Sequence, residues 1–326
     1  MLADDRRAAA APLLADRHFV LAWGLAALVL CADLLWFPLS RLRIADSRTF
    51  LSDLAIILGI VACYLALRGV CRRLGGDPHP VARVISRISG RISLAVGGFI
   101  FQIVLLGSVV VFTYLSASIG WPLRDAQLAS IDRWMGFDWP GFLALSNANA
   151  WWARVLVLAY DSSGPQLILV FLLLGLAGRR ARLAELSLLL SLTAVATILL
   201  YLVVPAAGAY AYYAPAPELF DHFDPQAGMW HYDVLRELRA GAAPAFAFEG
   251  SQGIVVFPSF HTMLAMLMPY AVRDIKPLFF PAAALNALVI ISTVPEGGHH
   301  LIDVLAGIVM ACAAIGVVRR LSSPNV

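Results

Sequence analysis

Long apolar segments, each about the length of a membrane-spanning helix, are the dominant pattern of the chain. A bilayer core about 30 Å thick requires about 20 consecutive apolar residues in a helix. Seven segments meet this requirement: 19–37, 50–70, 92–116, 182–204, 254–272, 277–294 and 299–318. The pattern predicts an all-α polytopic membrane protein.

An eighth apolar segment, 151–178, is interrupted by a polar run that begins at Asp161 and ends at Pro165. Backbone groups released by such a break must be satisfied by protein or by a water-filled cavity. We therefore predict about eight transmembrane helices, one of them broken. Asp161 has two interpretations, as part of the wall of a site or as a hydrogen-bonding group of the break.

Composition supports the membrane assignment. The chain of 326 residues is 60% hydrophobic and only 14% charged, with a mean hydropathy of +0.80. A soluble protein of this length needs more charge to cover its surface. The composition therefore excludes a soluble globular enzyme, a disordered chain and a nucleic-acid binder that uses a basic stripe.

The distribution of basic residues predicts the orientation in the membrane. With the N-terminus inside, the inner segments carry 15 basic residues and the longer outer segments carry 7. Positive charge accumulates on the cytoplasmic side of membrane proteins. Both termini are therefore expected to be cytoplasmic, and the first apolar segment is interpreted as a retained span. We expect a multi-pass protein of a bacterial inner (plasma) membrane.

Two long segments, 117–150 and 205–253, then lie outside the cytoplasm. The first contains Trp134 and Trp139, and indole rings are typical of an amphipathic segment in the membrane interface. The second is long enough to be a lid or a binding loop. In this interpretation, residues 1–91 contain an N-terminal tail and the first two spans, and residues 92–326 contain the other six spans.

Two clusters of polar residues each begin a helix on the outer side. The first runs from Pro258 to Thr262 and contains His261, and the second contains Gly297-Gly298-His299-His300 followed by Asp303. His299 and Asp303 are four residues apart and share one face of a helix. A carboxylate there orients one nitrogen of the imidazole and leaves the other nitrogen to react. Helix N-termini bind anions, so the pattern indicates phosphoryl chemistry on a lipid head group.

The two clusters resemble the motifs of the type 2 phosphatidic acid phosphatase superfamily. Pro-Ser-x-His at 258–261 and His-x-x-x-Asp at 299–303 match its second and third motifs over a core of about residues 92–326. The first motif, a Lys and an Arg-Pro pair, is missing, and Thr293 stands where the third motif has its arginine. These departures and the runs PSFHT and GGHHLIDVLAG resemble the inositol phosphorylceramide synthase and sphingomyelin synthase-like branch, which transfers phospho-head groups between lipids.

The resemblance implies a role for each matching residue. His299 corresponds to the nucleophile that forms a phosphohistidine, and Asp303 to the residue that orients it. His261 corresponds to the general acid and base. Ser259 and the amides around Phe260 correspond to the phosphate cradle. The chemistry of the family requires no metal and no cofactor.

Other residues are candidates for substrate binding. Arg236 and Arg239, or Arg154, are candidates to replace the missing phosphate ligands. Tyr210 lies where the first motif is expected. The segment around it either ends a helix or contacts the lipid head group. His300 is expected to contact the substrate or the interface, and Gly298 either lets the backbone approach a ligand or makes a turn. These residues are, in order along the chain, Arg154, Tyr210, Arg236, Arg239, Gly298 and His300.

Three classes of function are compatible with the pattern. The first is a lipid phosphotransferase or a phosphatase of lipid phosphates or isoprenyl diphosphates, acting on lipids in the bilayer at the outer leaflet. The second is a metal-dependent hydrolase, which is disfavoured because His299 and His300 are neighbours and face different directions. The third is a proton-coupled transporter that uses Asp161, which is disfavoured because no inverted repeat is visible.

Overall fold

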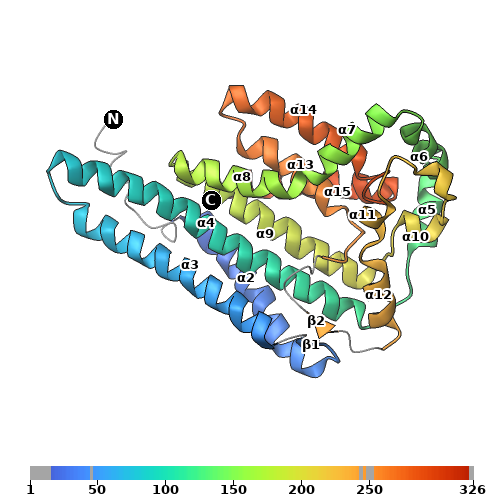
Figure 1. Ribbon diagram of the computed structural model, residues 1–326, viewed down its shortest axis with the longest axis horizontal. Helices are drawn as coiled ribbons and strands as arrows, with labels where there is room; N and C mark the ends of the chain where they lie inside the picture. The colour runs from blue at the N-terminus through green and yellow to red at the C-terminus, as the bar shows by residue number, and fades with distance from the viewer. Residues whose placement is uncertain (1–15, 45–46, 242–244, 247–252, 323–326) are drawn as a thin grey trace.

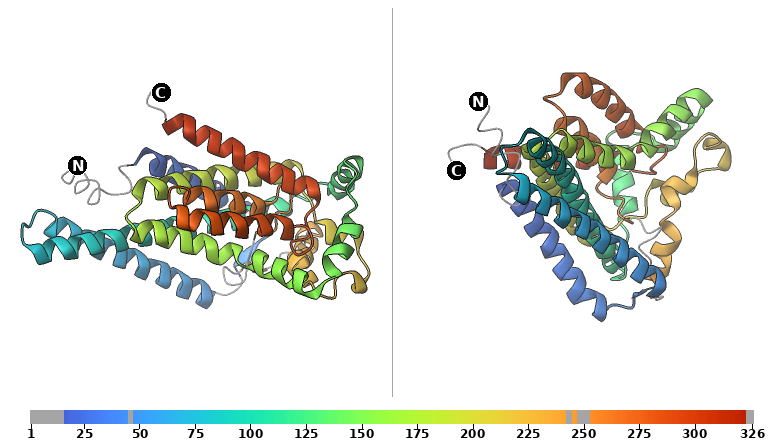
Figure 2. Two further views of the ribbon diagram at one scale, coloured as in Figure 1. Left: turned by 90° about the horizontal axis from the view of Figure 1, so that it is seen from above. Right: turned by 60° about the vertical axis from the view of Figure 1, so that its left-hand side comes forward.

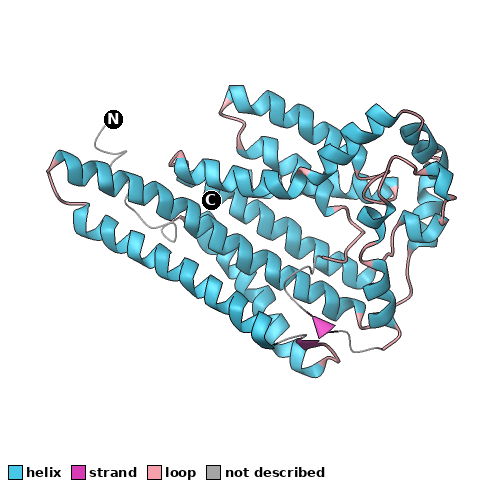
Figure 3. Ribbon diagram, viewed as in Figure 1, coloured by secondary structure: helices cyan, strands magenta, loops and turns pink. Residues whose placement is uncertain are grey.

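The computed structural model describes residues 16–44, 47–241, 245–246 and 253–322. Helices make up most of it (Figure 3). The only strands in these ranges are two short segments that pair in parallel, β1 (Arg43–Ile44) and β2 (Ala245–Phe246). The predicted all-α class is confirmed.

A bundle of long helices runs along the longest axis of the molecule (Figure 1). Its members are α2 (Arg17–Trp36), α3 (Ser47–Leu74), α4 (Pro80–Ala117), α7 (Ala150–Asp161), α8 (Ser163–Leu176), α9 (Arg180–Val203), α13 (Phe260–Ala271), α14 (Lys276–Ser292) and α15 (Leu301–Ser322). Short helices gather at one end of this bundle: η2 (Phe37–Leu39), α5 (Asp125–Trp134), α6 (Trp139–Asn147), α10 (Ala209–Tyr213), η3 (Pro217–Leu219), α11 (Pro225–Met229) and α12 (Tyr232–Arg239).

The number of full-length spans is smaller than the predicted eight. In the described part of the chain, α2, α3, α4, α9 and α15 are long and apolar enough to cross a membrane. The pair α7 and α8, bent by 46°, adds a sixth candidate. This bend lies at the break that the polar run at 161–165 predicts.

The two remaining apolar segments form shorter helices. The predicted span 254–272 is helical only from Phe260 onward, and the helix α13 has 12 residues. At about 1.5 Å per residue, this helix is too short for a bilayer core. The apolar stretch before it is irregular, because Pro258 has no amide hydrogen and Ser259 caps the helix. Hydropathy alone therefore overestimated the length of this helix. The other short helix, α14, has 17 residues.

The apolar core lies between α2, α4, α8, α9, α13 and α15. Phe19, Ala22 and Ala26 of α2 are buried in the same cluster as Phe101 of α4 and Leu186 of α9. Helix α3, in contrast, packs along α4 at the edge of the bundle (Figure 1). The two N-terminal spans are therefore not equivalent, since the first contributes to the core of the following helices.

The segment 117–150 forms two helices that cover the end of the bundle. Trp134 is 86% exposed, which fits the predicted interfacial segment, but Trp139 is completely buried. Asp125 and Asp132 of α5 are also buried and face inward. Part of the predicted lid, residues 242–244 and 247–252, lies outside the described residues, as does most of the N-terminal tail.

Candidate active site

The start of α15 brings His299 and Asp303 together. Nδ1 of His299 lies 3.4 Å from Oδ2 of Asp303, and both side chains are buried. The same carboxylate oxygen accepts a hydrogen bond from the amide of His300 at 2.9 Å. Asp303 is thus fixed by the backbone and in turn orients the His299 ring through Nδ1. Nε2 of His299 is the nitrogen that remains for chemistry.

His261 faces His299 from the first turn of α13. The centroids of the two rings are 6.5 Å apart. Nδ1 of His261 lies 3.4 Å from the hydroxyl of Tyr160, whose ring packs on the imidazole at a centroid distance of 4.6 Å. Sequence reasoning did not identify Tyr160, which is adjacent to the predicted break at Asp161. The two histidines therefore resemble each other, since each is held through Nδ1.

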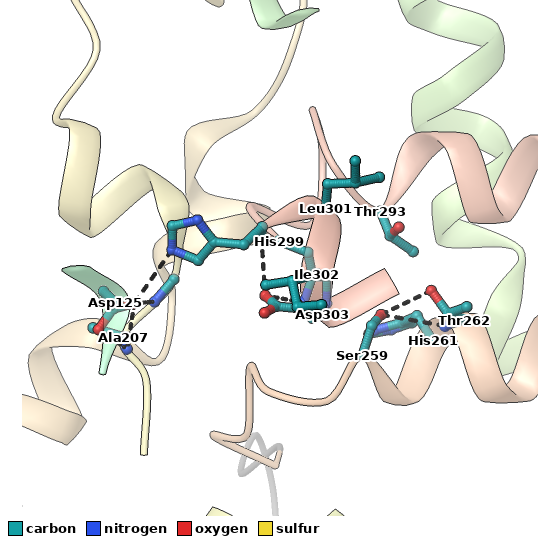
Figure 4. A network of polar contacts seen from close by, with 12 residues as sticks. Asp125, Ala207, Ser259, His261, Thr262, Thr293, His299, Leu301, Ile302 and Asp303 are labelled. Atoms are coloured by element: carbon teal, nitrogen blue, oxygen red, sulfur yellow. Dashed lines mark hydrogen bonds and ion pairs between the residues drawn. The ribbon is translucent and has the colours of Figure 1, made fainter. Parts of the chain in front are cut away.

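The N-terminus of α13 is tied to α15. The amide of Ser259 donates to the backbone carbonyl of Asp303 at 3.0 Å, and the hydroxyl of Ser259 accepts from the amide and the hydroxyl of Thr262. Figure 4 shows this group of side chains. Phe260 and His261 are the first residues of the helix, where helix geometry provides no acceptor for their amides. These amides, rather than the occupied Ser259 amide, are suited to bind an anion.

His300 lies between two carboxylates and is completely buried. Its Nε2 lies 3.6 Å from Asp125 and its Nδ1 3.7 Å from Asp132. Burial opposes the charged imidazole, but the two aspartates outweigh it and raise the pKa of His300 to about 9. This position corrects the expectation that His300 contacts the substrate or the interface.

The two aspartates of α5 also bind backbone amides of other segments. Asp125 accepts from the amides of Ala207 and Gly208, and Asp132 accepts from those of Leu301 and Ile302 at the start of α15. The sequence analysis selected neither of them. Their spacing of seven residues, which places them on one helix face, was the available signal. They fix the segment that carries His299.

The loop between α14 and α15 is closely packed around His299. The amide of His299 donates to the carbonyl of Thr293, and Nε1 of Trp139 donates to the carbonyl of His299 at 3.0 Å. A Cβ atom at Gly297 would lie 2.7 Å from Tyr160 and 3.1 Å from His299. Gly298 has a φ of +65°, and its carbonyl accepts a hydrogen bond from the amide of Ala209. Gly297 permits a close approach and Gly298 makes the turn.

Glu296 is a buried carboxyl group of this loop that the sequence analysis did not select. Its side chain is 1% exposed, and Oε2 has no hydrogen-bond partner in the described part of the chain. Burial, together with the charges of Asp161 and Asp224, raises the pKa of Glu296 to about 7. Asp161 therefore acts electrostatically on the loop that precedes His299.

Tyr210 is engaged with this loop. Its hydroxyl donates to the carbonyl of Pro295, and its ring packs edge-on against Trp139 at a centroid distance of 5.2 Å. Tyr210 is 3% exposed. Of the two interpretations left open for Tyr210, these contacts favour a structural role, in which the ring packs behind the His299 loop.

The candidate arginines have other contacts. Arg239 donates to the carbonyl of Trp121 at 2.7 Å, and Arg236 lies 3.9 Å from Asp233 on the exposed side of α12. Arg154 is exposed on α7. The contacts described for these side chains do not include His261 or His299.

Sequence reasoning missed another arginine, Arg133. This residue lines a cavity of about 380 Å³ together with Trp139 and Tyr213.

His231 supports the backbone segment that Asp125 also binds. It is buried, and its Nε2 donates to the carbonyl of Ala207 at 3.1 Å. Burial lowers the pKa of His231 to about 4, so the ring is neutral at physiological pH. Asp125 and His231 thus hold the same backbone segment from two sides.

Comparison with known proteins identifies a family for this chain. A family model described as the PAP2 superfamily matches residues 126–317, more than half of the chain. The match includes both histidine motifs and begins just after Asp125. Neither a curated protein nor a solved structure matches the chain. Within the described residues, no group of three or more His, Cys, Asp or Glu side chains is arranged to hold a metal ion.

Proposed function

The chain belongs to the PAP2 superfamily, and we propose that it is a membrane lipid phosphotransferase that moves a phospho-head group between lipids through a phosphohistidine. The observation that supports this most directly is the pair of imidazoles at a centroid distance of 6.5 Å, each held through Nδ1. Two imidazoles at this distance, each with Nδ1 engaged, suit a nucleophile on one side of a phosphorus atom and a proton donor on the other.

In the first step of the proposed reaction, His299 attacks the donor lipid. The lone pair of Nε2 forms the N–P bond while the bond from phosphorus to the leaving lipid oxygen breaks. His261 gives a proton to that oxygen, so a neutral lipid alcohol leaves. Asp303 stabilises the positive charge that develops on the His299 ring.

In the second step, an acceptor lipid alcohol attacks the phosphohistidine. His261 removes the proton from the hydroxyl group, the new O–P bond forms, and the N–P bond breaks with return of the electron pair to His299. The amides of Phe260 and His261 are suited to stabilise the phosphoryl oxygens. The proposal needs neither a metal ion nor a cofactor.

The reacting groups are withdrawn from solvent, which favours transfer over hydrolysis. Asp303 is fully buried and His299 is 4% exposed. Exclusion of water suppresses hydrolysis of a reactive intermediate. We therefore infer that the acceptor is a lipid alcohol, and that the site opens toward the outer leaflet in a cell membrane with both termini in the cytoplasm.

An acceptor assay tests the proposal. Purified protein in mixed micelles receives a phospholipid labelled in its head group, ceramide or diacylglycerol as acceptor, and a chelator. We expect label on the acceptor with the wild type and none with His299→Ala. Release of only free phosphate or a free phospho-head group would identify a hydrolase of the same superfamily. Activity that the chelator abolishes and Zn²⁺ restores would contradict the proposed metal-independent mechanism.

A further inference from the structure

A pair of helices projects beyond the rest of the bundle at the end opposite the candidate site. The last turns of α3 and the first turns of α4 form this projection, and Figures 1 and 2 show it extending past the other long helices. Helix α4 has 38 residues and is about 57 Å long, whereas a bilayer core is about 30 Å thick. Part of α4 therefore lies outside the hydrocarbon core.

Arg91 marks the level at which the projection leaves the bundle. Gly178, in the turn between α8 and α9, lies beside this arginine, because a Cβ atom on Gly178 would be 3.7 Å from Nε of Arg91. Residues 80–90 of α4 extend about 16 Å beyond this level. We call residues 68–91, which comprise the end of α3, the turn and the start of α4, the hairpin.

Small side chains hold the two helices of the hairpin together. Cys71, Ala82 and Ser89 are buried, and Sγ of Cys71 donates to the carbonyl of Ser86 at 3.7 Å. Because the contact between the helices uses these small residues, the larger side chains of the hairpin lie on its outer surface.

The hairpin carries a strong positive charge. It contains six arginines and one acidic residue, Asp77, which accepts from the amide of His79 at 2.8 Å. Within the described ranges, none of the six arginine side chains forms an ion pair or a hydrogen bond. Ion pairing inside the protein therefore does not account for them. One of the six, Arg68, is half-buried, and five are exposed: Arg72, Arg73, Arg83, Arg87 and Arg91.

An exposed apolar face lies beside a row of these arginines on α4. Arg83, Arg87 and Arg91 follow one another at intervals of four residues, so they share one side of the helix. A helix end that was only solvated would be polar on the neighbouring side as well. That side instead carries apolar side chains that are between 43% and 58% exposed, namely Val81, Val84, Ile85 and Ile88.

We propose that the hairpin binds the surface of anionic phospholipid in the leaflet opposite the candidate site. Helices α3 and α4 are both candidate spans, so the hairpin emerges directly from the bilayer and its side chains are within reach of the head groups. The apolar face continues through Ile92, which is 37% exposed, into the span of α4. This continuity favours lipid over a soluble acidic protein as the partner.

The two faces of the hairpin have complementary roles in this proposal. The arginines bind lipid phosphates, and the apolar face enters the boundary between head groups and acyl chains. Clusters of about four to eight basic residues directly beside a transmembrane helix bind anionic lipids in this way.

Hydrogen–deuterium exchange of the full-length protein in lipid nanodiscs tests the proposal. Discs of phosphatidylcholine alone are compared with discs in which part of this lipid is replaced by phosphatidylglycerol. We expect amide exchange in residues 72–91 to slow about fivefold or more in the anionic discs, because each basic residue near an anionic surface contributes about that factor. The slowing should decrease at about 1 M salt, which screens exposed charges. Exchange in α15 serves as the internal reference.

Two triple variants separate the hairpin from the total charge of this end of the molecule. Arg83→Gln, Arg87→Gln and Arg91→Gln together should abolish the slowing by phosphatidylglycerol. The matched control removes three exposed basic residues that lie at the same end but outside the hairpin, and it should retain the slowing: Arg179→Gln, Lys276→Gln and Arg320→Gln.

Each result has a defined meaning. Equal exchange in the two kinds of disc, or an equal loss of slowing in the two triple variants, would overturn the proposal. Ile85→Ser combined with Ile88→Ser keeps every charge and should reduce the slowing; an unchanged value would overturn the contact of the apolar face with lipid. If phosphatidylglycerol has no effect and added polyglutamate slows exchange in neutral discs, the surface binds an acidic protein instead.

Discussion

Nδ1 of His299 lies 3.4 Å from Oδ2 of Asp303, one helical turn further along the chain. His261 is held in the same way, through Nδ1 by the hydroxyl of Tyr160 at 3.4 Å. A hydrogen bond at one ring nitrogen determines which nitrogen is available for reaction. The carboxylate of Asp303 can stabilise the positive charge that develops on the His299 ring as Nε2 bonds to phosphorus, whereas the neutral phenol of Tyr160 offers His261 no such charge. The two imidazoles are therefore suited to different roles.

The partner of His299 gives the most direct test of these roles. Asp303→Asn keeps an oxygen for the amide of His300 but removes the negative charge beside Nδ1 of His299. We expect the rate of head-group transfer to fall by about 10²–10⁴-fold, because an oriented base of this kind contributes by that factor. The initial rate with labelled donor lipid measures the effect. Asp138→Asn, an exposed residue at the start of α6, is the control. A loss below tenfold in Asp303→Asn would exclude a role in orienting the nucleophile.

The sequence was sufficient to predict that His261, His299 and Asp303 lie near one another, because the two motifs place these residues at the starts of two helices. It was not sufficient to place His300, whose partners Asp125 and Asp132 lie about 170 residues earlier in the chain. Spacing within a segment predicts a shared face, but contacts between distant segments depend on how the helices pack.

The lengths of the helices show the same limit. Hydropathy predicts a span over 254–272. It measures only how favourably side chains transfer to lipid, and it does not register that Pro258 and Ser259 favour the start of a helix at Phe260. The break after Asp161, in contrast, is encoded locally by small and polar residues, and it was predicted at the correct position. Arg236 and Arg239 were selected by charge alone, which does not determine the direction of a side chain on an amphipathic helix.

The buried ion pairs of His300 predict a loss of stability at alkaline pH. The folded protein raises the pKa of His300 from its ordinary value of 6.5 to about 9, so the ion pairs stabilise the fold fully below pH 6.5. This stabilisation is lost as the pH rises through 9. His300→Asn should therefore lower the melting temperature at pH 6, with a smaller difference from the wild type at pH 9.5. Thermal unfolding of His222→Asn, which changes an exposed histidine, is the control. A difference that does not change with pH would contradict the assigned charge of His300.

The raised pKa of Glu296 predicts that the stability of the fold also changes with pH in a lower range. Its pKa is raised from 4.5 to about 7, so the folded state holds the proton more tightly than the unfolded state. Stability from this group is present below pH 4.5 and declines as the pH rises to about 7. Glu296→Gln should match the wild type near pH 4.5 and melt about 2–4 °C higher at pH 8. Glu218→Gln, at an exposed position, should show no such gain. A variant that is less stable than the wild type at pH 8 would contradict the raised pKa assigned to Glu296.

The last prediction concerns Gly297, because the loop packs so closely around this residue that there is no room for a side chain. A Cβ atom there would lie 2.7 Å from both the carbonyl oxygen of Thr293 and Cε2 of Tyr160, and 3.1 Å from Cδ2 of His299. Gly297→Ala should displace Tyr160 and His299 and reduce the transfer rate about 100-fold, since a displacement of about 1 Å in an active site has an effect of that size. The control is Gly316→Ala on α15, where a Cβ atom meets nothing within 4 Å. The rate of this control should equal that of the wild type, because the substitution lies at the far end of the helix and favours helix formation. If Gly297→Ala retains the wild-type rate, the close packing of the His299 loop is not needed for the reaction.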